Sequence, residues 1–186
     1  MGNSQFNIVF DNEKSLTSTD YEQCTFKNCD FSEVSLSDIK FSECKFENCN
    51  LSLIKTDNTA FREVEFVECR MLGVRFDYCN SFNLKIAFKH CQLQYSSFYQ
   101  LNLPKTQFHH CQMMGIDFTE TTLTSSVFND CNLDQAIFAQ SKLEKVNFKS
   151  AYNYSIHPEN NKIKGAQFSI SGLPGLLQSY KIEIEN

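Results

Sequence analysis

The 186-residue chain contains no tryptophan, only six glycines and three prolines, and no apolar run of the roughly 18 residues that a membrane span needs. So little Gly and Pro excludes a collagen-like or low-complexity chain. The opening MGNSQFNIVFDNEKS has no basic segment followed by an apolar stretch, so we expect no export signal. These absences predict a soluble, cytoplasmic protein without a membrane partner.

Sequence motifs of enzyme chemistry are also missing. No GxGxxG, GxxxxGK or HExxH run occurs. His90 and His110 are separated by one full period of the cysteine pattern described below, with His109 beside them, but the next residue at that interval is Asp130, so no Ser or Cys nucleophile with an orienting acid accompanies them. We therefore predict no enzyme activity, no cofactor and no catalytic or metal-ligating residue.

A basic surface is lacking as well, because the net charge is −5. Residues 1–80 carry 14 Asp and Glu against 8 Lys and Arg, whereas residues 81–150 carry 5 against 6 and residues 151–186 carry 3 against 3. Without clustered Lys and Arg we expect no direct nucleic-acid binding. A basic protein, or a protein that normally holds nucleic acid, remains open as a partner.

What the sequence does have is a period of five. From Leu16 to Ser81 every fifth residue is apolar except Thr56 and Ser81, and from Phe88 to Phe148 all thirteen such residues are large and apolar. Neither the period of a strand, 2, nor that of a helix, 3.6, explains this pattern. It predicts an all-β solenoid in which each unit buries one side chain and turns a corner.

The nine cysteines indicate how many units form one coil. Each cysteine lies in the same slot of the repeat, two places before a central fifth residue. Eight of them form three ladders of period 20: Cys24 and Cys44; Cys29, Cys49 and Cys69; Cys91, Cys111 and Cys131. The ninth, Cys79, occupies the same slot before Ser81. Four units per turn predict a four-sided coil, and residues 16–150 then make about seven coils.

We interpret the cysteines as buried reduced thiols, because parallel inward side chains suit neither a disulfide nor a zinc site. In such a dry ladder, a serine hydroxyl at position 49 is expected to lack a hydrogen-bond partner.

The register slips once, between Ser81 and Phe88, where the spacing is seven instead of five. The run FNLKIA, residues 82–87, therefore holds two extra residues. Two interpretations stay open: a corner bulge that the scaffold tolerates, or a bend or displayed element with a function.

Residues 1–15 lack the period and form the predicted N-terminal cap. Phe6, Ile8 and Phe10 alternate as in a short strand that covers the open end of the solenoid.

Residues 151–186 form the predicted C-terminal cap, since the repeat ends at residue 150. Phe168 returns to the phase of the repeat, Ser171 is expected to cap a short helix that includes Pro174, and KIEIE alternates as a closing strand. This segment is too small to bury its apolar side chains alone, so it must cover the coil end, pair with a second copy, or do both.

Units such as CTFKN-CDFSE and CNLDQ-AIFAQ-SKLEK-VNFKS resemble the pentapeptide-repeat family over residues 16–150. The resemblance implies a right-handed, four-sided parallel β-helix, in agreement with the count of four units per coil.

The tail SIHPENNKIKGAQFSISGLPGLLQSYKIEIE resembles the C-terminal segment of the gyrase-protecting members, which are the Qnr, mycobacterial quinolone-resistance and microcin B17 immunity types. This resemblance implies a homodimer joined end to end, whose acidic surface imitates DNA on a type II topoisomerase and protects the enzyme from quinolones or a gyrase-directed toxin. The expected dimer contacts are apolar residues of the tail that have no place inside a coil filled by its own central residues: Leu173, Leu176, Leu177, Tyr180, Ile182 and Ile184. The implied partner-facing surface consists of acidic residues in the N-terminal half: Glu33, Glu43, Glu63, Glu65, Glu68 and Asp77.

A second hypothesis is a non-enzymatic adaptor rod that binds another protein. It is favoured by outward ladders of mixed charge, in which Lys27 is paired with Glu47 and Lys45 with Glu65. The large projecting loops of many Qnr proteins are also absent from this chain.

Overall fold

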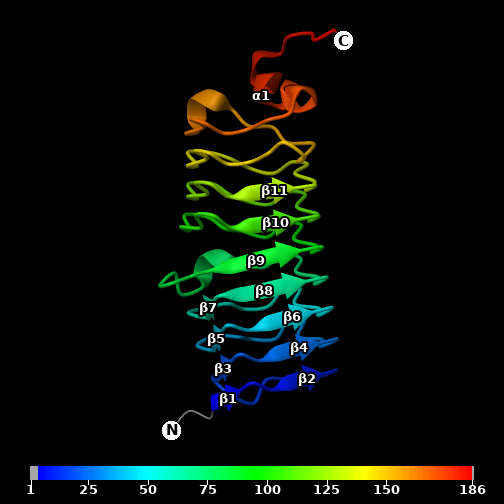
Figure 1. Cartoon of the computed structure of the whole chain (residues 1–186), viewed down its shortest axis with the longest axis vertical. Coiled ribbons are helices and arrows are strands. Elements are labelled where there is room, and N and C mark those ends of the chain that lie inside the picture. Colours follow the sequence, from blue (N-terminus) through cyan, green and yellow to red (C-terminus); the bar gives the residue numbers. More distant parts are fainter. Residues whose placement is uncertain (1–3, 186) are drawn as a thin grey trace.

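The computed structural model describes residues 4–185, which form an elongated rod with its N- and C-terminal ends at opposite tips (Figure 1). Short strands recur along the rod: β1 (Ser4–Phe6), β2 (Val9–Asp11), β3 (Asp20–Glu22), β4 (Thr25–Lys27), β5 (Lys40–Ser42), β6 (Lys45–Glu47), β7 (Ala60–Arg62), β8 (Val64–Val67), β9 (Ile86–Lys89), β10 (Gln107–His109) and β11 (Val127–Asn129). Helical turns are few: η1 (Phe76–Tyr78), η2 (Pro158–Asn160), η3 (Ile170–Gly172), α1 (Pro174–Leu177) and η4 (Gln178–Tyr180). No helix in residues 4–185 is long and apolar enough to cross a membrane.

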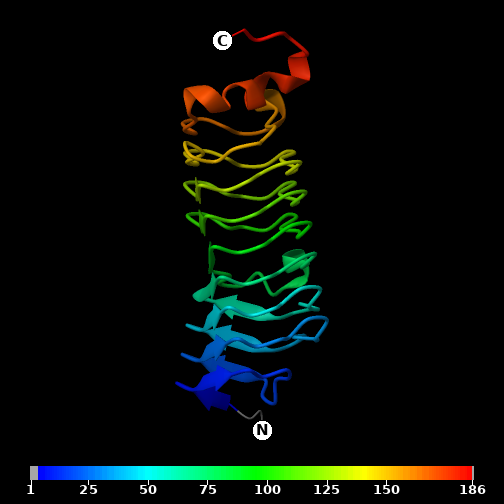
Figure 2. The same cartoon turned by 90° about the vertical axis from the view of Figure 1, so that its right-hand side faces the viewer.

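The strands stack as two parallel sheets that run along the rod (Figure 2). One sheet has the order β1-β3-β5-β7, and the other has the order β11-β10-β9-β8-β6-β4-β2. In the longer sheet Phe26 pairs with Phe46 at the regular step of the repeat, whereas Phe66 pairs with Phe88 across the two extra residues. The seven strands of this sheet mark six turns of a parallel β-solenoid, which confirms the predicted fold class.

Each coil turns its corners at residues with left-handed backbone geometry. In one coil, Glu43, Asn48, Leu53 and Asn58 have φ angles of 52°, 52°, 57° and 53°. Four corners, one in each unit of the repeat, give the coil four sides, as the cysteine spacing predicted. Asn suits this geometry better than most residues, while Glu and Leu adopt it at a cost of about 1–2 kcal/mol.

The core is built around the fifth residues of the repeat, of which the phenylalanine rings stack from coil to coil and the others are mostly leucine or methionine. Phe26 and Phe46 have ring centroids 4.6 Å apart and planes 12° apart, and Phe108 and Phe128 repeat this arrangement at 4.7 Å. The predicted inward register is thereby confirmed, with one exception. Ser81 is exposed, because the coil departs from the repeat at that point.

All nine cysteines are buried and reduced, as predicted. Burial raises the pKa of the Cys44 thiol to about 12, so this thiol stays protonated near neutral pH. The thiols also have hydrogen-bond partners: Cys49 Sγ lies 3.4 Å from the Phe26 carbonyl oxygen of the preceding coil and 3.3 Å from that of Glu47.

The expectation that a hydroxyl in this slot lacks a partner is wrong. Ser141 occupies an equivalent slot, is fully buried, and donates a hydrogen bond of 2.8 Å to the Phe118 carbonyl oxygen of the preceding coil. Thr121 makes the same 2.8 Å bond to Phe98. The backbone of the coil below therefore offers an acceptor to whichever donor fills the slot.

The N-terminal segment is part of the solenoid rather than a separate strand. Asn7, with a φ of 52°, turns a corner between β1 and β2, so the single strand expected from Phe6, Ile8 and Phe10 is divided in two. The Phe10 ring stacks on Phe26 at 5.0 Å. Residues 4–11 thus form a shortened first coil that covers the end of the core, while residues 1–3 lie outside the described residues.

The C-terminal segment begins as one more level of the coil. Phe168 stacks on Phe148 with centroids 5.4 Å apart, as its phase predicted. The predicted cap is wrong, because the helix that contains Pro174, α1, has Leu173 at its N-cap and no side-chain cap. Ser169 instead caps the preceding turn η3: its hydroxyl accepts a 3.1 Å hydrogen bond from the amide of Gly172, the last residue of η3.

The short helix α1 follows with Pro174 at its first position, as expected. Residues 181–185 do not form the closing strand that KIEIE predicted; they are exposed and run across beyond the C-terminal tip of the rod (Figure 2).

Candidate functional site

The predicted acidic residues do not form one stripe. Glu43 and Glu63 are exposed at successive levels of the same corner, and Glu65 follows on β8. Glu68 is exposed at the next corner of that coil. Glu33 is exposed two corners before Glu43, and therefore on the diagonally opposite edge of the rod.

Asp77 does not present a carboxylate to a partner. Its side chain is only 5% exposed, and Arg75 holds it through hydrogen bonds of 2.9 Å from Nε and 2.6 Å from Nη2. The Arg75 guanidinium also lies over the Tyr78 ring, 4.5 Å from its centroid. The prediction that Asp77 belongs to the acidic partner-facing surface is therefore wrong.

The outer face of the longer sheet is balanced in charge. Lys27 lies 3.3 Å from Glu47, and Lys45 lies 2.6 Å from Glu47 and 3.9 Å from Glu65. The hydrogen bond from Lys45 is the main cause of a lowered Glu47 pKa. Such exposed pairs contribute only about 0.2–1 kcal/mol each, but they neutralise the face, as the mixed ladders predicted.

The two extra residues are placed by the corner geometry. The corner residues that stack above one another at intervals of one coil form a column, which includes Glu43 and Glu63. Asn83, with a φ of 56°, is the next corner in this column. In the coil of Glu63 the strand β8 begins immediately after the corner, at Val64, whereas β9 does not begin until Ile86. Leu84 and Lys85 are therefore the insertion, and they lie between corner and strand.

The insertion interrupts the backbone ladder at this corner. Elsewhere in the column a corner amide donates to a carbonyl oxygen of the next coil, as from Glu43 to Arg62 at 2.8 Å and from Lys105 to Thr124 at 2.9 Å. Within residues 4–185, the corner amides of Glu63 and Asn83 make no such bond to the next coil.

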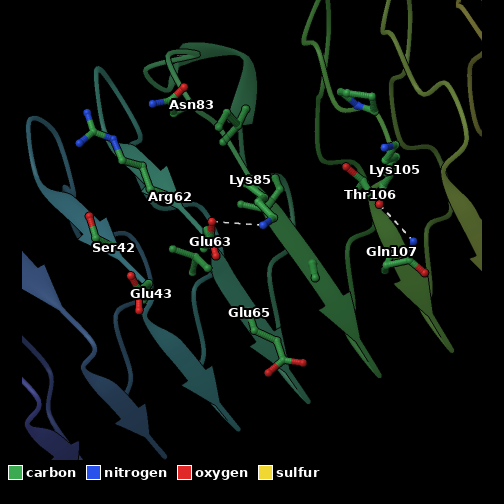
Figure 3. A pocket seen from close by; sticks show the side chains of 15 residues that line it. Ser42, Glu43, Arg62, Glu63, Glu65, Asn83, Lys85, Lys105, Thr106 and Gln107 are labelled. Carbon is green, nitrogen blue, oxygen red and sulfur yellow. Dashed lines mark hydrogen bonds and ion pairs between the residues drawn. The ribbon is translucent and has the colours of Figure 1, made fainter.

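A groove of about 830 Å³ opens beside the insertion (Figure 3). It extends over four successive coils and is lined by Ser42, Glu43, Arg62, Glu63, Val64, Glu65, Asn83, Leu84, Lys85, Ile86, Ala87, Pro104, Lys105, Thr106 and Gln107. Three of the predicted acidic residues therefore meet at one concave site. The groove was not predicted from the sequence, although the two extra residues and the small Ala87 at an outward position were signals for it.

The two ends of the groove differ in charge, although Arg62 also lines it next to Glu63. Glu43 and Glu63 precede the insertion in the corner column, and Lys105 follows it. Between them, Lys85 Nζ lies 3.2 Å from a Glu63 carboxylate oxygen, as the central dashed line in Figure 3 shows. Glu43 accepts a 3.0 Å hydrogen bond from the Gln23 side chain.

The predicted dimer residues differ in exposure. Leu176 packs against the core and Leu177 is half-buried. The others are exposed, in fractions of 45–55%: Leu173, Tyr180, Ile182 and Ile184. The Tyr180 hydroxyl donates a 2.9 Å hydrogen bond to Glu159, which ties η4 to η2 and raises the Tyr180 pKa.

Tyr154 anchors the C-terminal segment from below. This residue is only 3% exposed, and its hydroxyl has no hydrogen-bond partner within residues 4–185. Burial raises the pKa of this hydroxyl. Gly172 and Gly175 lie so close that a methyl group on either would overlap Tyr154.

The histidine ladder is present as expected. The rings of His90 and His110 stack 4.7 Å apart with planes 6° apart, and His110 Nδ1 lies 3.7 Å from Asp130 Oδ2. Among residues 4–185, no group of three or more His, Cys, Asp or Glu side chains is arranged to hold a metal ion.

These features define a parallel β-solenoid with four-sided coils of five-residue units. The pentapeptide repeat region family matches residues 15–87 and 83–168, so the chain belongs to that family. Comparison with curated protein sequences gives no match.

Among solved structures, the chain is similar to two trypsin-treated variants of QnrB1, described as a plasmid-mediated fluoroquinolone resistance protein. The first has 17% identity and a TM-score of 0.65, covering 98% of this chain and 97% of the other. The second has 16% identity and a TM-score of 0.65, covering 100% of both chains. HetL, a pentapeptide repeat protein involved in heterocyst differentiation in the cyanobacterium Nostoc, has 12% identity and a TM-score of 0.33, covering 91% of this chain and 85% of HetL. At such identities the likeness concerns the fold.

Proposed function

We propose that this protein is a DNA-mimicking rod that binds a type II topoisomerase, DNA gyrase, and protects it from quinolones or from a gyrase-directed toxin. The observation that carries the proposal is the correspondence with a trypsin-treated variant of QnrB1, at a TM-score of 0.65 over 98% of this chain. That correspondence includes the C-terminal segment that follows the repeat. QnrB1 is a fluoroquinolone resistance protein, and we extend that role to this chain as our proposal.

Two features of the chain support this function. Glu33, Glu43, Glu63, Glu65 and Glu68 are exposed in the N-terminal half of the rod. The exposed apolar side chains of the C-terminal segment favour a homodimer, which would double the rod and place its acidic halves at the two outer ends.

The alternative is an adaptor rod for another protein. It is favoured by the charge balance of the sheet face, where Lys45 forms ion pairs with both Glu47 and Glu65, and by the Arg75–Asp77 pair. A DNA mimic gains from an uninterrupted acidic surface, whereas an adaptor needs only local complementarity.

A supercoiling assay with purified gyrase separates the two. If the chain is a protector, gyrase should keep supercoiling at a quinolone concentration that inhibits the enzyme alone. A variant with Glu43→Gln, Glu63→Gln and Glu68→Gln should lose that effect. The matched control is Glu120→Gln, an exposed corner residue in the C-terminal half, which should retain it. If the full-length chain neither protects nor inhibits gyrase, the adaptor function is favoured.

A further inference from the structure

We propose that the groove beside the insertion binds an extended segment of a protein partner, a short peptide stretch with a basic side chain at one end and an acidic side chain at the other. This inference is separate from the proposed action on gyrase. It rests on the shape, floor, free backbone groups and charges of the groove.

The shape fits a short peptide lying parallel to the rod. The groove reaches from Glu43 to Lys105, which are on the first and last of four successive coils. Three steps of about 4.8 Å make about 14 Å, the length of about four extended residues at about 3.3 Å each. Its volume, about 830 Å³, lies within the usual range for binding sites.

The floor offers an apolar contact surface. Leu84, Ala87 and Pro104 supply it, since their side chains are half-buried or exposed, and Val64 and Ile86 lie almost fully buried beneath. Ala87 faces outward on β9, directly between Glu65 on β8 and Gln107 on β10. Because its neighbours in this ladder carry long side chains, the small Ala87 leaves the space that a partner side chain can fill.

The walls of the groove offer backbone N–H groups to which a peptide can bind. The corner amides of Glu63 and Asn83 make no bond to the next coil within residues 4–185, unlike the amides of Glu43 and Lys105 in the same column. An extended peptide satisfies such groups through its own main chain, as peptides do at the edges of sheets.

The charges set which peptide fits. Glu43 lies at the N-terminal end of the groove, Glu65 on the next coil, and Lys105 at the other end (Figure 3). In the middle, Lys85 and Glu63 neutralise each other through an exposed ion pair that costs little to open. Arg62 lies beside the Phe82 ring, with its guanidinium carbon 5.8 Å from the centroid. A basic side chain therefore fits beside Glu43 and Glu65, and an acidic one beside Lys105.

The test uses the full-length chain, labelled for NMR, and the peptide Ac-Arg-Ala-Val-Glu-NH2. The Val64, Ile86 and Ala87 signals should shift and saturate with a Kd of about 1 mM or lower, the affinity of a weak single-segment contact. Ala87→Gln fills the groove with the residue that β10 tolerates at position 107, and should weaken binding at least tenfold. If the shifts are absent at saturating peptide, or unchanged in Ala87→Gln, the groove is not a peptide site.

A charge reversal tests the orientation. Glu is compatible with the left-handed corner of Lys105, because Glu43 and Glu63 adopt it in the same column. Lys105→Glu should therefore preserve the fold and shift the preference to Ac-Arg-Ala-Val-Arg-NH2. Lys145→Glu, two coils further along this column and outside the groove, should leave the preference unchanged. If the doubly basic peptide already binds the unaltered chain better, the charge assignment is wrong.

Discussion

At the scale of single residues, the position of a side chain in the repeat determines its hydrogen-bond partner more than its residue type does. The slot two places before each central residue holds Cys49 in one coil and Ser141 in another, and both donate to a carbonyl oxygen of the coil below. The sequence predicted which residues point inward, because burial follows the five-residue period. It did not predict the acceptor, since the carbonyl belongs to a residue in the preceding coil.

Cys49→Ser is therefore expected to be tolerated, with a loss of less than about 1 kcal/mol, because the hydroxyl gains a hydrogen bond comparable to the one the thiol loses. Cys49→Leu should cost about 1–3 kcal/mol by overpacking the same slot. Thermal unfolding of the two variants measures the difference. Equal losses in the two would show that the slot does not supply the acceptor.

Phe108→Ala should destabilise the rod by about 3–5 kcal/mol, because the ring is fully buried between Phe88 and Phe128. His109 is the next residue but lies on the outer face, so His109→Ala should change stability by no more than about 0.5 kcal/mol. Denaturant unfolding compares the two, and similar midpoints would contradict the register.

At the scale of elements, regular pieces were predictable and local contacts were not. The phase of Phe168 predicted the last level of the coil, because the stacking of rings repeats once in every coil. Ser171 does not cap α1, because it lies within the preceding turn η3 and Leu173 is the residue before α1; the sequence does not signal that extra turn. The alternation in KIEIE suggested a strand, but residues 181–185 have no neighbouring strand to pair with.

The docking of the C-terminal segment should depend on two glycines. Gly172→Ala and Gly175→Ala should each loosen the segment at a cost of about 1–3 kcal/mol, because the new methyl overlaps Tyr154. Hydrogen exchange of residues 170–180 should rise in both variants while the coils stay protected.

A second substitution distinguishes the two contacts. The Gly172 methyl meets the Tyr154 hydroxyl, whereas the Gly175 methyl meets the Tyr154 backbone carbonyl oxygen. Adding Tyr154→Phe should therefore partly rescue Gly172→Ala and leave Gly175→Ala unchanged. Rescue of both would mean that the ring, rather than these two atoms, sets the fit.

At the scale of the whole molecule, the five-residue period determines that the chain forms a rod. Departures from the period determine where one coil differs from the coils next to it. The insertion at Leu84 and Lys85 was visible as a slip in the count. The groove was not, because it needs three features at once: an interrupted ladder, the small Ala87, and side chains from four coils. The number of acidic residues could likewise be counted in the sequence, but the neutralisation of Asp77 by Arg75 depends on their contact in space.

Assembly of the whole molecule should depend on the C-terminal segment. Removal of residues 171–186 should convert a dimer into a monomer of less than 21.5 kDa and abolish any protection of gyrase, while the coil signal in circular dichroism remains. Because this truncation also uncovers Tyr154, a second variant is needed. Leu173→Asp, Ile182→Asp and Ile184→Asp change only exposed side chains and leave Leu176 packed on the core. Burying three carboxylates is costly, so this variant should also sediment as a monomer. A full-length chain that sediments at 21.5 kDa at micromolar concentration would contradict the dimer, and the exposed tail would then require another partner.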